Sequence, residues 1–107
     1  MIEKQILQAL TFDEEYTRQV LPFLKEDYFV QTEHTLVFKV INEYFDKYNS
    51  LPKREALVID ISQRGGVDDK TIQAATELVE SFEGAIVDDW LVDQTESFCQ
   101  DKAIYNA

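Results

Sequence analysis

Glycine, proline, cysteine and histidine are all scarce in this chain. Its 107 residues include three glycines, two prolines, one cysteine and one histidine. Sandwiches and barrels need frequent turn residues, so this shortage favours helices over sheets. The single cysteine, Cys99, excludes an internal disulfide framework and fits a reducing cytoplasm. One histidine and one cysteine also exclude the usual structural zinc sites, whose four ligands come from these two residue types.

Positive charge is scarce as well. The chain has 10 Lys and Arg residues against 21 Asp and Glu residues, a formal net charge of −11. This balance repels phosphate backbones and anionic membranes, and the basic residues form no stripe of the kind that nucleic-acid binders carry. No apolar run approaches the roughly 20 residues that span a bilayer. We therefore expect protein partners, with little direct nucleic-acid binding and no membrane attachment.

Apolar residues, in contrast, are plentiful and regularly spaced. Hydrophobic residues make up 45% of the chain, enough for a core in one domain of this size. They recur at helical spacing in six segments, and the strongest segment carries Val37, Phe38, Ile41, Tyr44, Phe45 and Tyr48. The expected boundaries are caps at Asp13 and at Asp68 or Asp69, a helix that opens at Thr32, Pro52 in a first turn, and stops at Gly65-Gly66 and Gly84. The pattern predicts an all-α fold, a compact bundle of about six helices.

The last segment offers a candidate interface. Asp88-Asp89 begins a helix with Leu91, Thr95, Phe98, Lys102 and Tyr105 on one face and Trp90 beside it. No glycine, proline or basic last turn closes this helix, so we expect it to continue in the native polypeptide. Aromatic residues at helical spacing usually belong to a core. We expect a packing partner of this helix beyond Ala107 or in another subunit. A subunit or partner interface is therefore an equal alternative, with the candidate residues Trp90, Leu91, Phe98 and Tyr105.

Residues that could carry chemistry have simpler structural explanations. No glycine-rich loop followed by Lys and Ser or Thr is present, and Gly65-Gly66 fits a helix stop better than a phosphate cradle. The acidic clusters stand where helices begin, which explains them without a metal. His34 lies in a helical first turn, where packing or capping is more common than catalysis. We expect no catalytic, cofactor or metal site in this stretch.

Several ordered patterns resemble a known family. Tyr28-Phe29 is followed by His34 and, four residues later, by Phe38, as in the N-terminal domains of DnaB-type replicative helicases. Ser50-Leu51-Pro52 likewise resembles the connection before their fourth helix. Within that family, the chain is similar to the T-even-type phage members in two further patterns, Phe12-Asp13 with Tyr16, and Trp90-Leu91-Val92 with Thr95-Glu96. It departs from bacterial members around Gly65-Gly66-Val67.

The resemblance implies an architecture and a set of partners. Residues 1–87 would form the globular bundle, and residues 88–107 the first arm of a truncated helical hairpin. Such domains pair subunits in the collar of a hexameric helicase and contact primase, and the helicase loader is a further candidate partner. ATP and magnesium would belong only to a missing C-terminal motor domain, that of an ATP-dependent DNA helicase in the cytoplasm of the infected bacterial host.

Two alternatives come from other functional classes. One is a free-standing acidic helical phage protein that binds or inhibits a host protein by mimicking DNA. It should carry carboxylates along one face at phosphate-like spacing, whereas the carboxylates here gather at helix starts and are otherwise scattered. The other is an enzyme, which would need a cleft containing His34 or carboxylates with perturbed titration.

Overall fold

The computed structural model describes residues 2–105, and most of these residues are helical. They form six α-helices, two short 3₁₀-helices and no strand: α1 (Ile2–Phe12), α2 (Glu14–Val20), η1 (Leu21–Phe23), η2 (Glu26–Tyr28), α3 (Thr32–Tyr48), α4 (Arg54–Ser62), α5 (Asp69–Glu80) and α6 (Asp89–Tyr105). The predicted all-α fold with about six helices is confirmed.

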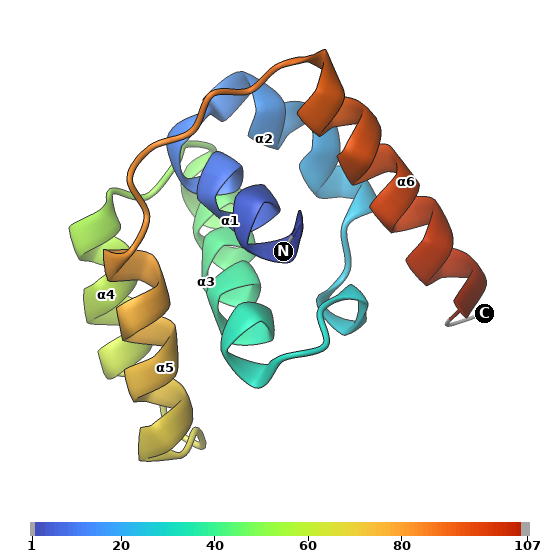
Figure 1. Cartoon of the computed structure of the whole chain (residues 1–107). Coiled ribbons are helices and arrows are strands. Elements are labelled where there is room, and N and C mark those ends of the chain that lie inside the picture. The colour runs from blue at the N-terminus through green and yellow to red at the C-terminus, as the bar shows by residue number, and fades with distance from the viewer. Residues whose placement is uncertain (1, 106–107) are drawn as a thin grey trace.

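The helices are arranged around α1 and α3. Figure 1 shows α4 and α5 as an antiparallel pair on one side of these two helices and α6 on the other. The α4–α5 pair packs on α3, whereas α6 packs on α1, α2 and η2. Residues 81–88 have no helical structure and carry the chain from the α5 side to the α6 side. The last helix is thus held mainly by the N-terminal third of the chain.

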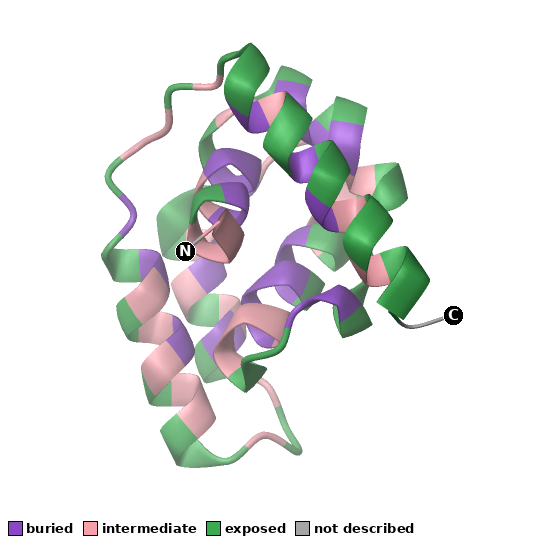
Figure 2. Cartoon of the chain, turned by 45° about the vertical axis from the view of Figure 1, so that its right-hand side comes forward, coloured by how far each residue is buried: buried purple, intermediate pink, exposed green. Residues whose placement is uncertain are grey.

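Apolar side chains from all six α-helices fill the core. The largest fully buried ones are Tyr16, Phe38, Phe82, Ile6, Leu7, Leu10, Ile41, Leu57, Ile61, Val37, Val40 and Val79. Figure 2 shows these buried positions on the inward faces of the helices. Full burial of one large apolar side chain contributes about 1.5–3 kcal/mol, so packing of these faces is the main stabilising term. In the strongest predicted segment, Val37, Phe38 and Ile41 belong to this core. The second half of the segment does not, because Tyr44 and Phe45 are half-buried and Tyr48 is exposed.

Acidic residues begin three of the helices. Asp13 accepts a hydrogen bond from the Tyr16 amide at 2.8 Å and caps α2, as predicted. Of the two candidates before α5, Asp68 is the cap and accepts from the Thr71 amide at 3.2 Å. Asp88 accepts from the Leu91 amide at 3.0 Å at the start of α6. Each carboxylate satisfies an amide that has no partner inside the helix.

Two predicted boundaries are wrong. Pro52 does not lie in the first turn of α4, which begins at Arg54. Instead, Asn49 ends α3 in the left-handed conformation, and Pro52 lies in the non-helical connection between the two helices. The fifth helix stops at Glu80, well before Gly84. Phe82 lies beyond that end, yet it is fully buried, and its carbonyl accepts a hydrogen bond from the Arg54 guanidinium. Tertiary contacts thus replace the last predicted helical turn.

Candidate interaction surface on the last helix

A buried pair of hydroxyl groups joins α6 to α2. The Tyr16 hydroxyl lies 2.6 Å from Oγ1 of Thr95, and both residues are buried. Oγ1 of Thr95 donates its only proton to the Leu91 carbonyl at 2.8 Å, so Tyr16 donates to Thr95. Burial raises the pKa of Tyr16 to about 12, because the phenolate would lose its hydration. This polar contact fixes α6 at one position along α2.

An aromatic cluster holds α6 one turn further along. The Phe98 ring lies 5.6 Å from that of Phe29 and 6.4 Å from that of Tyr28, measured between centroids. Phe29 in turn stacks on Phe38 of α3 at 5.0 Å. Tyr28 and Phe29 are both buried, so they anchor the connection before α3. The cluster links α6 to the centre of the bundle.

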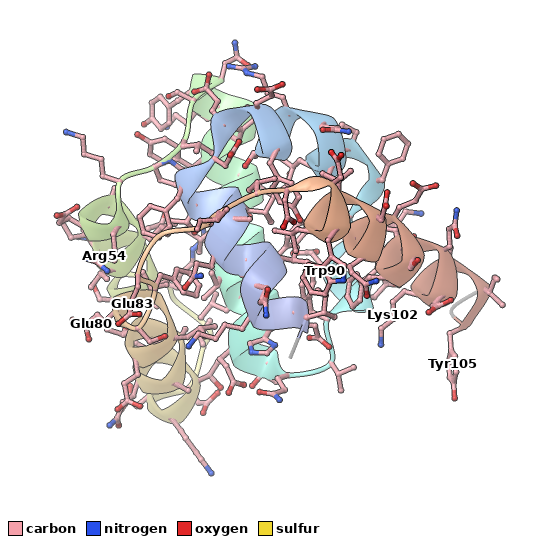
Figure 3. All side chains as sticks on the ribbon, turned by 45° about the horizontal axis from the view of Figure 1, so that its top comes forward. Arg54, Glu80, Glu83, Trp90, Lys102 and Tyr105 are labelled. Carbon is pink, nitrogen blue, oxygen red and sulfur yellow. The ribbon has the colours of Figure 1, made fainter. Side chains whose placement is uncertain are left out.

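The four predicted interface residues divide into two pairs. Leu91 is 4% exposed and Phe98 8% exposed, so both pack inside this chain and are not accessible to a partner. Trp90 is 53% exposed and Tyr105 is 89% exposed. Tyr105 continues the buried face of α6 but is exposed, because α6 projects past the bundle at its C-terminal end (Figures 1 and 3). Only Trp90 and Tyr105 stay as candidates for an interface.

Ile104 belongs with them, although the pattern of apolar residues on α6 did not point to it. Ile104 is an exposed apolar residue near the end of α6. It follows Trp90 by fourteen positions, close to four helical turns, so the two lie on the same side of the helix. A helical projection of residues 88–105 would have found it. Trp90 near the start of α6, and Ile104 and Tyr105 near its end, are large apolar residues that the rest of the described chain leaves exposed; we call these three residues the α6 outer face.

The groups considered for chemistry have structural roles. Nδ1 of His34 lies 3.0 Å from Oε1 of Glu3, and this contact joins α3 to α1. Burial raises the pKa of the Cys99 thiol, the opposite of what activates a nucleophilic cysteine. Within residues 2–105, no three His, Cys, Asp or Glu side chains gather in a way that could hold a metal ion. In the same range, no helix combines the length and hydrophobicity needed to cross a membrane.

Comparison with known proteins identifies the family. The model of the DnaB-like helicase N-terminal domain matches residues 1–88, most of the chain. This chain belongs to that family. A DnaB-like replicative helicase of Enterobacteria phage T4 is 28% identical over 102 residues, which cover 95% of this chain and 22% of that relative. The chain therefore spans about a fifth of the length of the relative it matches.

The residues that suggested a DnaB-type domain turn out to build its fold. Phe29 and Phe38 stack on each other, and Tyr28 meets α6 through Phe98. His34 contacts Glu3. None of these side chains is part of the exposed surface of α6. In this DnaB-like helicase N-terminal domain, this part of the pattern therefore reports the packing of α1, α3 and α6, whereas Trp90 of the phage-type pattern is exposed.

Proposed function

We propose that this domain is the N-terminal assembly and partner-docking domain of a phage replicative DNA helicase, which pairs subunits in the hexamer collar and contacts primase. Membership of the DnaB-like N-terminal family and the similarity to a phage replicative helicase support this role. The helicase loader is a further candidate partner. The domain itself carries out no chemistry; ATP and magnesium belong to a motor domain elsewhere in the protein, which acts in the cytoplasm of the infected host.

The α6 outer face is the observation that carries the proposal. Trp90, Ile104 and Tyr105 are exposed on α6, and the C-terminal end of this helix projects past the bundle. Aromatic residues are enriched at protein interfaces because they bury a large area at a low entropic cost. We assign residues 1–87 to the globular bundle and residues 88–107 to the first arm of a helical hairpin; of these, residues 1, 106 and 107 lie outside the described part of the chain. In this arrangement, the α6 outer face receives the second arm or a neighbouring subunit.

The charge of the domain suits a collar that does not compete for DNA. With a net charge of −11, the domain repels the phosphate backbone. DNA is then bound by the ring of motor domains and not by this domain. The same charge permits partners with basic surfaces, because complementary potentials raise association rates.

The purified domain is expected to show no ATP hydrolysis above a no-protein blank, because the chain contains no glycine-rich phosphate loop. A coupled assay for released phosphate checks this, with a protein that contains the motor domain as the positive control. Turnover that persists through purification and disappears on substituting a residue of this chain would contradict the assignment.

Substituting the two exposed aromatic residues of α6 should weaken partner binding. We expect Trp90→Ala combined with Tyr105→Ala to reduce affinity for the primase of the same phage by about tenfold or more, because interface energy concentrates in such side chains. Isothermal titration calorimetry measures the affinity, and light scattering measures self-association. Ile59→Ala, a change at an exposed apolar residue of α4, is the matched control and should alter neither. Equal effects of both variants, or no effect of the double change, would argue against α6 as the interface.

A further inference from the structure

A surface groove runs between α6 on one side and α2 with η1 on the other. It has a volume of about 400 Å³ and is lined by Gln19, Val20, Phe23, Val92, Thr95, Glu96, Cys99 and Gln100. Phe23 is 67% exposed at its edge, and Val92 and Cys99 are half-buried in it. The groove is distinct from the α6 outer face, since Trp90, Ile104 and Tyr105 do not line it.

A second depression continues this groove toward the start of α6. It has a volume of about 210 Å³ and shares Gln19 and Val92 with the first. Four carboxylates line it: Asp13, Glu15, Asp88 and Asp89. We call the two depressions together the α2–α6 groove. None of the residues that line it is a lysine or an arginine. The groove therefore has an apolar end near Phe23 and an acidic end near Asp89.

The length of the α2–α6 groove matches a short helix. On α6 its lining extends from Asp89 to Gln100. At 1.5 Å per residue this distance is about 17 Å, or roughly three helical turns. An α-helix of that length presents apolar side chains on one face at spacings of three and four residues. Such a face can cover Phe23, Val92 and Cys99 together.

Charge decides which kind of helix fits. A second copy of this chain has a net charge of −11, and its own α6 carries Asp89, Asp93, Glu96 and Asp101. Bringing that helix against the acidic end of the groove would place like charges together, which opposes association. DNA and RNA are disfavoured for the same reason. A basic helix has the complementary sign.

We propose that the α2–α6 groove binds a short amphipathic α-helix of a partner protein. Its apolar face packs on Phe23, Val92 and Cys99, and lysine or arginine side chains at one end meet the carboxylates of Glu15 and Asp89. The inference rests on the proposed docking function and specifies a surface and a partner chemistry for it. It names a surface other than the α6 outer face, so the two can be tested separately.

Two designed peptides test the proposal. The first is a helical peptide of about 14 residues with leucines at spacings of three and four and lysines at one end; the second has glutamates in place of the lysines. Titrated into the ¹⁵N-labelled chain, the basic peptide should shift the amide signals of Val20, Phe23, Val92 and Cys99. We expect its Kd to be at least about tenfold lower than that of the acidic peptide at low salt.

Variants of the chain supply the controls. Phe23→Ser, and separately Glu15→Lys with Asp89→Lys, should each weaken binding of the basic peptide by about tenfold. Val30→Ser changes an equally exposed apolar residue that does not line the groove and should leave binding unchanged. Cys99 is the only cysteine of the chain and lies in the groove, so bound peptide should slow its reaction with a thiol reagent.

Each other outcome overturns a defined part of the inference. Equal affinity for the two peptides, signal shifts centred on Trp90 and Ile104, or an unprotected Cys99 would overturn the groove as a site for a basic helix. A dimer whose formation depends on Phe23 would assign the groove to a second copy instead. Primase binding that needs Trp90 and Tyr105 but not Phe23 would uphold the proposed function and reject this surface. Peptide binding in the groove without any primase binding or self-association would uphold this surface and reject the proposed function.

Discussion

Replacing Phe98 with alanine is expected to lower the free energy of unfolding by about 3–5 kcal/mol, the range for truncating a buried aromatic residue. Phe98 is the main apolar contact between α6 and the aromatic pair Tyr28 and Phe29. Its loss leaves a cavity where α6 meets the centre of the bundle. Urea unfolding followed by circular dichroism measures the change, and hydrogen exchange of the α6 amides shows whether this helix opens first.

Tyr105→Ala is the matched control for Phe98→Ala. Both residues are aromatic and lie on the same face of α6, seven positions apart. Because Tyr105 is almost fully exposed, its truncation should change the free energy of unfolding by less than about 0.5 kcal/mol. Similar losses for both variants would mean that the end of α6 is packed, contrary to the structure. A negligible loss for Phe98→Ala would mean that α6 is not anchored by the aromatic cluster.

This pair of variants also shows where sequence patterns stop being informative. Leu91, Phe98 and Tyr105 share one helical face, and the pattern alone treats them alike. Whether a position on that face is buried depends on where the bundle beneath it ends, which is a tertiary property. The sequence therefore predicted the helix and its inward face, but not the point at which that face becomes free for a partner.

Local signals predicted most helix starts because their causes are local. Asp13 and Asp68 cap their helices through amides three residues away, and these contacts follow directly from residue type and position. The end of α5 could not be predicted in this way. It is set by burial of Phe82 and by the contact of its carbonyl with Arg54, which lies 28 positions earlier. Gly84, the local stop signal, lies in the connection beyond it.

The α2–α6 groove was beyond sequence analysis for the same reason. Phe23 on η1 and Val92 on α6 line one groove although about seventy residues separate them. Neither residue stands out locally, since a single exposed apolar residue is normal on protein surfaces. The acidic pairs near Asp13 and Asp88 were correctly explained as helix starts, and only the fold shows that both starts open onto the same depression.

Raising the pH from 10 to 12 is expected to lower the free energy of unfolding through Tyr16. Its pKa is about 12 in the folded chain, against an ordinary value of 10.0. Between these values, the unfolded chain releases the Tyr16 proton while the folded chain keeps it, so stability is full below pH 10 and falls as pH rises toward 12. A two-unit difference corresponds to about 2–3 kcal/mol. Urea unfolding at a series of pH values measures this loss.

Tyr16→Phe isolates the contribution of this one group from the other tyrosines and lysines that titrate in the same range. At neutral pH the variant should lose about 1 kcal/mol, because Thr95 no longer accepts the buried hydrogen bond. Between pH 10 and pH 12, its stability should fall less steeply than that of the parent chain by the amount assigned to Tyr16. Parallel pH profiles for the two proteins would show that the hydroxyl ionises as easily in the folded state as in the unfolded state. The Tyr16–Thr95 contact would then be open to water, and α6 would be held on α2 by apolar packing alone.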